Sequence, residues 1–414
     1  MAFPLTSKRG SFLFPPSLRP LTQKTFGLFW AGAFLSSIGF WIQSVGQGWQ
    51  VLQLTNSVFL LGLVTFAATL PTIVLALFGG VIVDRMNRRH LLLGTQLVYM
   101  STALLLGILT TLHWITVWQI IVLALINGIC SSVGFPAWQA YVGDLVPPEQ
   151  LKQGIALNSM QFNLSRVVGP AIGGISIGLV GIAGSYYLNA LSYLAVLLPL
   201  LLLRPRQKQR PAAAQGIWQG LLEGLHYVRM RPAVQMALLL QFMIAFLVFP
   251  YVTLLPVFAR DIFHIGPTGL GVMNAAAGIG AFLGAILVVA LSQRMKRNLR
   301  VLLLLCITGG LACIVFALSA SLTLALLLLV VLGACTVMSM TVTNTTLQSM
   351  SPEEMRGRVL SIWVLFTFGL APFGYLVAGW VAQVIGASTT LLIGGTLCAL
   401  LALLIAGVRA RMSS

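Results

Sequence analysis

Long apolar runs alternate with short polar connections along nearly the whole chain. A run of about 20 apolar residues is long enough for an α-helix to cross the hydrocarbon core of a bilayer. Twelve such runs are present, at residues 26–51, 58–83, 90–111, 115–143, 154–179, 184–203, 233–258, 268–292, 300–319, 322–349, 357–383 and 388–408. The pattern predicts an all-α membrane protein with twelve transmembrane helices.

The positions of the cations indicate how these helices are oriented. Of the 24 Lys and Arg residues, Arg166 lies inside a predicted helix and Arg260 lies in the connection between the seventh and eighth helices. The other 22 lie in the tails 1–24 and 409–414, or in or at the edges of connections that an even number of helices places on one side. Because short loops rich in Lys and Arg stay in the cytoplasm, both tails are predicted to be cytoplasmic.

The composition agrees with a membrane protein and excludes other classes. The chain is 58% hydrophobic and 7% charged, whereas about 25% of the residues of a soluble protein are charged. A net charge of +17 could suggest nucleic-acid binding, but the cations are spread over short loops and form no basic domain. The five cysteines all lie inside apolar runs without metal-ligand spacing, so no disulfide framework, metal or cofactor is expected.

The two halves of the sequence repeat one another. The segment 84–88 (Asp-Arg-Met-Asn-Arg) aligns with 293–297 (Gln-Arg-Met-Lys-Arg), 209 positions later, and Pro170 aligns with Pro372, 202 positions later. Near-constant offsets indicate an internal duplication. The expected domains are two pseudo-symmetric six-helix bundles at 25–203 and 233–408, joined by a cytoplasmic connection at 204–232 that carries an amphipathic surface helix.

One turn carries a recognisable motif. Between the second and third apolar runs the sequence reads Gly-x-x-x-Asp-Arg-x-x-Arg-Arg, formed by Gly80, Asp84, Arg85, Arg88 and Arg89. This motif resembles the loop between helices 2 and 3 of major facilitator superfamily (MFS) transporters. The resemblance implies the MFS fold, with alternating access by rocking of the two halves around a central cavity.

In that family the loop locks the cytoplasmic face through charge pairs, so the resemblance implies a conformational gate. We expect Asp84 to face the start of helix 11, and Asp144, at the end of helix 4, to pair with Arg85 or Arg88. The second copy of the loop contributes the cations Arg294 and Arg297 to the predicted gate. The alternative is that the arginines only fix the topology of the loop.

The fifth helix carries the second candidate constellation. Its polar residues are Asn158, Gln161, Asn163 and Arg166, and Gly169, Pro170, Gly173 and Gly174 form its helix-packing motif. Arg166 lies about 12 residues into the helix, roughly 18 Å deep at 1.5 Å per residue. The segment resembles the helix-5 signature of MFS antiporters and exporters. Two interpretations of Arg166 stay open: it binds an anionic group of the substrate, or it is structural.

Neutral polar side chains supply the remaining candidates. Amides in predicted helices are candidates for substrate contacts in a cavity, with interhelical hydrogen bonding as the alternative. They are Gln43, Gln47, Asn127, Gln241, Asn274 and Asn344, with Gln50, Gln139 and Gln348 nearby in sequence. None of the seven acids lies in the middle of a predicted helix, so no deep proton carrier is evident. Coupling would use Asp84, Asp144 or Asp261 near the faces, or no proton at all.

Three passages, 35–57, 143–151 and 165–170, resemble the enterobactin-exporter and macrolide-efflux branch of the superfamily. The branch implies a monomeric exporter in a bacterial inner membrane, coupled to protons, for a medium-sized amphiphile such as a siderophore, macrolide or other drug. A lysophospholipid flippase or other lipid importer is the alternative. A membrane-embedded enzyme is a remote one, because no catalytic base, nucleophile or metal site is evident.

Overall fold

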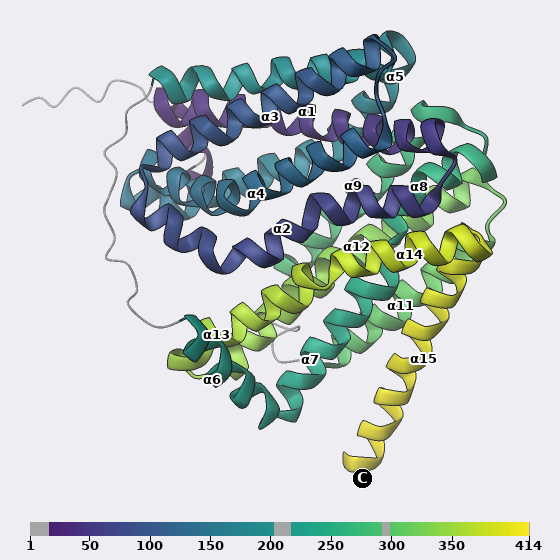
Figure 1. Ribbon diagram of the computed structural model, residues 1–414. Helices are drawn as coiled ribbons and strands as arrows, with labels where there is room; N and C mark the ends of the chain where they lie inside the picture. Colours follow the sequence, from purple (N-terminus) through teal and green to yellow (C-terminus); the bar gives the residue numbers. More distant parts are fainter. Residues whose placement is uncertain (1–15, 203–216, 292–298, 414) are drawn as a thin grey trace, which may run out of the picture.

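The computed structural model describes residues 16–202, 217–291 and 299–413, with side chains for all of these except 16–17, 73–74, 76–85, 217–221 and 408–413. Every regular element in these ranges is helical (Figure 1). The elements are η1 (Pro16–Thr22), α1 (Lys24–Thr55), α2 (Val58–Arg85), α3 (Arg88–Thr111), α4 (Val117–Leu145), η2 (Pro148–Gln150), α5 (Leu151–Leu202), α6 (Ile217–Arg229), α7 (Pro232–Met243), η3 (Ile244–Val248), α8 (Tyr251–Val257), η4 (Phe258–Ile262), α9 (Gly266–Ala290), α11 (Leu299–Leu318), α12 (Leu322–Met350), α13 (Glu353–Val364), η5 (Leu365–Gly369), α14 (Ala371–Ile385) and α15 (Ala387–Ser413).

The prediction of an all-helical membrane protein is confirmed. Ten helical runs in the described part of the chain are long and apolar enough to cross a membrane, and Val58–Thr72 of α2 is a shorter apolar segment. The π-helical turns η3 and η5 join neighbouring helices and η4 continues α8 to Ile262, so that Pro232–Ile262 and Glu353–Ile385 are continuous runs. The first of these extends four residues beyond the predicted end at 258.

Local sequence explains where the helices begin and end. The Asn87 side chain accepts hydrogen bonds from the backbone N–H groups of Arg89 and His90 and so caps the start of α3. Thr116 and Gln119 form a capping box at the start of α4. Asn56 ends α1 in the left-handed conformation, with φ 50°. These caps fix the short turns that connect antiparallel helices.

The longest element, α5, folds back on itself at Gly181. This glycine has φ 71° and ψ 179°, which a residue with a Cβ rarely adopts. The hydroxyl oxygens of Ser176 and Ser185 lie 3.1 Å apart across the bend. The two arms therefore correspond to the two apolar runs predicted at 154–179 and 184–203, and both pack against α1.

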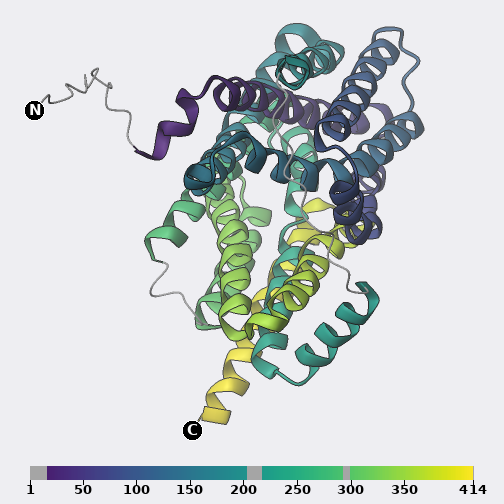
Figure 2. The same cartoon turned by 90° about the vertical axis from the view of Figure 1, so that its left-hand side faces the viewer.

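The turns divide the molecule into two ends. We call the end with the turns at Asn87, 146–150 and 351–352 the Arg88 end, and the end with the turns at 56–57, 112–116, Gly181, 263–265, 319–321 and Gly386 the Asn56 end. In Figure 1 the Arg88 end lies at the left and the Asn56 end at the right. Seen from the Arg88 end, the N-terminal half (residues 16–202) lies above the C-terminal half (residues 217–413) (Figure 2).

The halves touch mainly through α2 against α14 and α5 against α9. Glycines allow these helices to approach closely. A Cβ on Gly62 would lie 2.7 Å from the Tyr375 carbonyl oxygen, and one on Gly271 would lie 2.6 Å from that of Pro170. Such small-residue contacts replace the hydrophobic driving force that is missing between helices in lipid. Both contacts lie in the part of the molecule toward the Asn56 end.

The helix α6 lies within the predicted connection 204–232 and packs on α13. Glu223 forms an ion pair with Arg358, and the Tyr227 hydroxyl donates to the Met350 carbonyl over 3.2 Å. Leu222 and Leu225 are exposed on α6. This combination of a docked polar side and an exposed apolar side is typical of an interfacial helix.

Candidate functional site

A cavity of about 700 Å³ lies in the N-terminal half, between α1, α2, α3, α4 and α5. Aromatic and uncharged polar side chains dominate its wall. The aromatic ones are Phe40, Trp41, Tyr99, Phe135, Trp138, Phe162 and Tyr193. The polar ones are Ser36, Ser37, Gln43, Ser44, Gln47, Thr65, Thr69, Thr72, Thr95, Gln96, Asn127, Ser131, Gln139, Asn158, Ser159, Gln161 and Asn163. The volume and the lining suit a medium-sized molecule with apolar and hydrogen-bonding groups.

Most of the candidate amides on this wall form hydrogen bonds within the protein. Gln43, Asn127, Asn158 and Gln161 line the cavity but are each held by a protein partner. Gln43 accepts from Asn189 over 2.7 Å, Asn127 from Thr102 over 2.8 Å and Asn158 from Trp138 over 3.0 Å. Gln161 donates to the Ala33 carbonyl and the Ser37 hydroxyl over 3.0 and 2.6 Å. For these four amides, hydrogen bonding within the protein is therefore observed.

Other polar groups on the wall have no hydrogen-bond partner in the described part of the chain. Among them are the amides of Gln47 and Gln139, and also Trp41 Nε1 and Gln96 Oε1, two atoms that are buried within the protein. Of these, only Gln47 is among the main sequence candidates. Gln96 follows an arginine-rich turn and was not singled out, because a lone amide in an apolar run gives no signal about which face it occupies.

A second cavity of about 140 Å³ lies beside the first, on the side of the C-terminal half. Thr69 and Thr72 of α2 line both cavities. Gln241 lines the smaller one and accepts a hydrogen bond from Thr343 over 3.3 Å. Asn274 and Asn344 line neither; each bonds within its own helix, to the Leu270 carbonyl and to Gln348, respectively.

Arg166 lies on α5 where this helix packs on α9, half-buried and outside the lining of both cavities. Its backbone carbonyl lies 2.5 Å from the position of a Cβ built on Gly278, so the helices are in close contact here. Tyr251 and Tyr375 of the C-terminal half lie within electrostatic range of its side chain. In the described residues its guanidinium has no ion pair.

The helix-packing motif of α5 faces two neighbours. Gly169 and Gly173 lie against Trp41 and Ile42 of α1, and Gly174 lies against Gly271 of α9. A larger residue at Gly174 would meet the backbone of α9. These glycines therefore hold α1, α5 and α9 together on the side of the cavity toward the Asn56 end.

At the Arg88 end, Asp144 pairs with Arg88. One guanidinium nitrogen, Nη1, donates to both carboxylate oxygens over 3.0 and 2.9 Å, and the side chains are only 7% and 6% exposed. Arg89 donates to the Leu200 and Leu201 carbonyls at the end of α5. This arrangement agrees with the expected partner of Asp144. The pair joins α3 to α4, two helices of the same half.

The other predicted gate residues fall outside the described part. Gly80, Asp84 and Arg85 belong to α2, where the side chains are not described, and Arg294 and Arg297 lie between the described ranges. The expected contact of Asp84 with the start of helix 11 stays a prediction.

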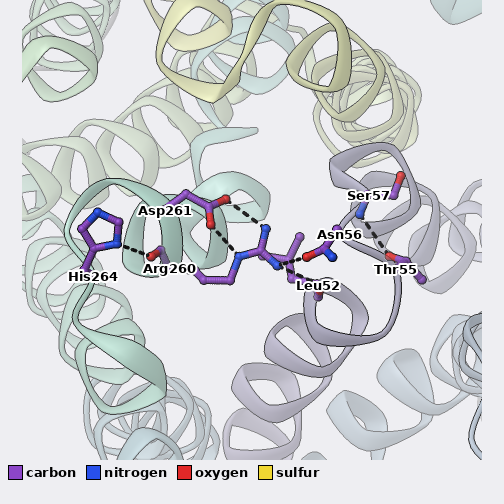
Figure 3. A network of polar contacts seen from close by, with 7 residues as sticks. All are labelled: Leu52, Thr55, Asn56, Ser57, Arg260, Asp261 and His264. Carbon is purple, nitrogen blue, oxygen red and sulfur yellow. Dashed lines mark hydrogen bonds and ion pairs between the residues drawn. The ribbon is translucent and has the colours of Figure 1, made fainter.

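At the Asn56 end, a polar network joins the two halves (Figure 3). Asp261 accepts two hydrogen bonds from the Arg260 guanidinium over 2.6 and 3.0 Å and so orients it. Arg260 Nη1 then donates to the Leu52 carbonyl over 2.9 Å and to Asn56 Oδ1 over 2.8 Å. The positive group thereby caps the negative end of α1. His264 Nδ1 lies 2.9 Å from the Arg260 carbonyl oxygen.

Arg260 was predicted to lie in a connection, but it lies on η4, the last turn of a helical run that continues beyond the predicted end. Its exceptional position, a lone cation on the side otherwise free of Lys and Arg, was the signal that could have marked it as functional.

A second link at this end is made by Gln383 of α14. Its Oε1 accepts from the Ser57 hydroxyl over 3.0 Å and from the backbone N–H of Val58 over 2.7 Å. These are donors at the start of α2 that have no partner inside the helix. Gln383 thus caps a helix of the other half and adds to the closure of the Asn56 end.

Comparison with known proteins identifies the class. The family model described as transmembrane secretion effector (MFS_3) matches residues 16–414. The chain therefore belongs to this family of the major facilitator superfamily, as the loop motif predicts, and it is a transporter rather than an enzyme.

Several characterised relatives match over most of their length. The multidrug efflux pump Tap of Mycolicibacterium fortuitum is 28% identical over 383 residues, 90% of this chain and 91% of the pump. The staphyloferrin A transporter of Staphylococcus aureus is 26% identical over 374 residues, 89% and 93% of the two chains. The enterobactin exporter EntS of Shigella boydii is 28% identical over 346 residues, 83% and 81% of the two chains.

A solved structure supports the fold. The bacterial homologue of the human lysosomal transporter Spinster, in an inward-facing and unoccupied conformation, superposes with a TM-score of 0.70 and 16% identity, covering 95% of this chain and 96% of that one. At this identity the likeness concerns the fold alone.

Proposed function

We propose that this MFS transporter exports a medium-sized amphiphilic molecule, such as a siderophore, a macrolide or another drug, by alternating access. The observation that carries the proposal is the cavity of about 700 Å³ whose wall combines aromatic rings with amides and hydroxyls. Relatives named as a multidrug efflux pump and as siderophore transporters support export of molecules of this size.

The topology follows from the fold and the cations. We count α5 as two spans because it folds back at Gly181, and we count α2 as one, which brings the ten apolar runs to twelve. The spans would form two six-helix bundles, 25–203 and 233–408. The Arg88 end and both tails would face the cytoplasm. The expected setting is a bacterial inner membrane, with the protein as a monomer.

With this orientation the Asn56 end faces outward, and its links between the halves close the outer side. Arg260 and Gln383 each cap a helix of the N-terminal half. The contacts of α2 with α14 and of α5 with α9 support the same closure. We assign the structure to the inward-facing state, in which the cavity receives its substrate from the cytoplasm or the inner leaflet.

The Arg88 end would close when the halves rock the other way. Because the Arg88–Asp144 pair lies within one half, its role in the gate would be to fix α3 against α4 and so to place the neighbouring cations. The contact between halves would come from Asp84 and Arg85, and from Arg294 and Arg297 in the second copy. Proton coupling would use an acid near a face: Asp84, Asp144 or Asp261.

Uptake into inside-out vesicles tests the proposal. Vesicles with the protein and vesicles without it would receive siderophores, macrolides and lysophospholipids, each with and without an uncoupler. Uptake of a siderophore or macrolide that stops with the uncoupler is the expected result. Uptake that persists with the uncoupler contradicts proton coupling, and a preference for lysophospholipid contradicts the substrate class.

A further inference from the structure

We propose that the cavity binds the uncharged form of its substrate, an aromatic or macrocyclic amphiphile that carries neutral hydrogen-bonding groups. The inference rests on the proposed transport function, and it concerns the charge of the substrate, which the family and its relatives leave open. Two observations support it: the residue types that line the two cavities, and the hydrogen bonds that some of the polar lining residues already form within the protein.

The wall of the large cavity offers no charge to a ligand. Among its described lining residues there is no Asp, Glu, Lys, Arg or His, although it contains seven aromatic side chains. The described lining of the smaller cavity likewise contains none of these five residue types. An ion that moves from water to such a site loses hydration and finds no opposite charge, which makes its binding strongly unfavourable.

Arg166 is the one deep cation that could change this conclusion, and its position argues against it. Its side chain lies between α5 and the C-terminal half and lines neither cavity. Tyr251 and Tyr375 of the C-terminal half lie within electrostatic range of its guanidinium. The Tyr251 hydroxyl is buried and makes no hydrogen bond in the described structure.

The cavity does offer neutral hydrogen-bonding groups. Gln43, Asn127, Asn158 and Gln161 each use at least one amide atom on the protein and fix the shape of the wall. Gln47, which is half-buried, and Gln139, which is exposed, line the cavity with amides that have no hydrogen-bond partner in the described part of the chain, so each offers a donor and an acceptor. A ligand that pairs with these amides gains a modest net hydrogen-bond energy for each bond, about 1 kcal/mol.

The two accessible unpaired amides lie on different helices beside the cavity, Gln47 on α1 and Gln139 on α4. We assign polar contacts of the substrate to these two side chains. Phe40 and Phe135, which are 52% and 65% exposed, provide apolar surface beside them. A wall of aromatic rings and neutral amides selects a substrate by its shape and its hydrogen-bonding groups.

Equilibrium binding to the purified full-length protein in detergent tests the charge selectivity. The probes are three derivatives of one dansyl–alkyl scaffold that end in a methyl ester, a carboxylate or a trimethylammonium group, and dansyl emission excited through protein tryptophan is the readout. We expect the ester to bind at least about tenfold more tightly than either ion, the ratio that a difference of one unsatisfied polar group produces.

Two variants sharpen the test. Gln47→Glu adds a carboxylate to the wall with almost no change in shape, so the trimethylammonium probe should gain about tenfold relative to the ester, whereas the matched Gln47→Met should weaken all three probes alike. Arg166→Gln should leave the order of the three probes unchanged.

The inference is overturned if the carboxylate binds as tightly as the ester in the natural protein, and more so if that binding disappears in Arg166→Gln. It is also overturned if the trimethylammonium probe binds best without Gln47→Glu. These outcomes concern binding in detergent, so they are independent of vesicle uptake. Loss of uptake with the ester preference intact would contradict the proposed transport function and leave the charge selectivity standing.

Discussion

Replacing Arg260 by glutamine should release the outer closure. The substitution removes the two hydrogen bonds from Nη1 to the Leu52 carbonyl and Asn56 Oδ1, which join the C-terminal half to the N-terminal half. A charge-assisted hydrogen bond contributes about 1.5–3 kcal/mol. Because the Arg260 side chain is 25% exposed, we take about 1 kcal/mol for each bond, or about 2 kcal/mol in all.

This loss acts only on the state closed at the Asn56 end, so it should shift the equilibrium between inward- and outward-facing states about 30-fold toward outward-facing. Spin labels on cysteines placed at Leu112 and Ala320, one in each half at the Asn56 end, would report the shift as a larger population of long distances. Arg260→Lys should shift this equilibrium less, because lysine keeps the positive charge but lacks the planar guanidinium with its several hydrogen-bond donors.

The matched control is Arg229→Gln, which removes an exposed arginine of α6 far from the Asn56 end. It should leave the distance distribution unchanged. If Arg260→Gln gives the same distribution as this control, with the protein folded, then the network of Figure 3 does not hold the outer side closed.

Further substitutions test the other parts of the account. Asp144→Asn leaves Arg88 buried without its partner and should lower the free energy of unfolding by about 3–5 kcal/mol, measured by denaturant titration. The double variant Arg88→Met/Asp144→Asn should recover most of that loss, and an additive result would contradict the pairing. Gly174→Val places a side chain against the backbone of α9 and should favour the outward-facing state in the same spin-label measurement. Gly181→Ala should instead lower the stability of the protein, because alanine is strained at the φ of 71° that this position adopts. Gln383→Leu removes the cap on α2 and should shift the state equilibrium about five- to tenfold in the same direction as Arg260→Gln; a shift toward the inward-facing state would refute this assignment.

The helices could be predicted from the sequence because apolar length and loop charge are both local signals. The bend of α5 was predictable to within a few residues because the apolar run is too long for one span and contains glycine at 181. The predicted partner of Asp144 could be named because the motif and the end of helix 4 meet on one side of the membrane. The structure selects Arg88 from the two arginines considered.

The site was less predictable because it depends on which way a side chain faces. Gln47 and Gln161 are both amides in apolar helices, yet one is unpaired on the cavity wall and the other is bonded to α1. Amide spacing alone does not reveal a partner on another helix. The Arg260 network escaped prediction for a similar reason, since its acceptors are a backbone carbonyl and Asn56, more than 200 positions away in sequence.

The central claim is that transport requires the Asn56 end to open. The most direct measurement is uptake into inside-out vesicles by a Ser57→Cys/Gln383→Cys variant, whose two positions are in contact across the halves, before and after cross-linking with a short bifunctional thiol reagent. The account predicts that cross-linking stops uptake while the ester probe still binds, and that a cleavable reagent restores uptake after reduction. Full uptake by completely cross-linked protein would contradict it.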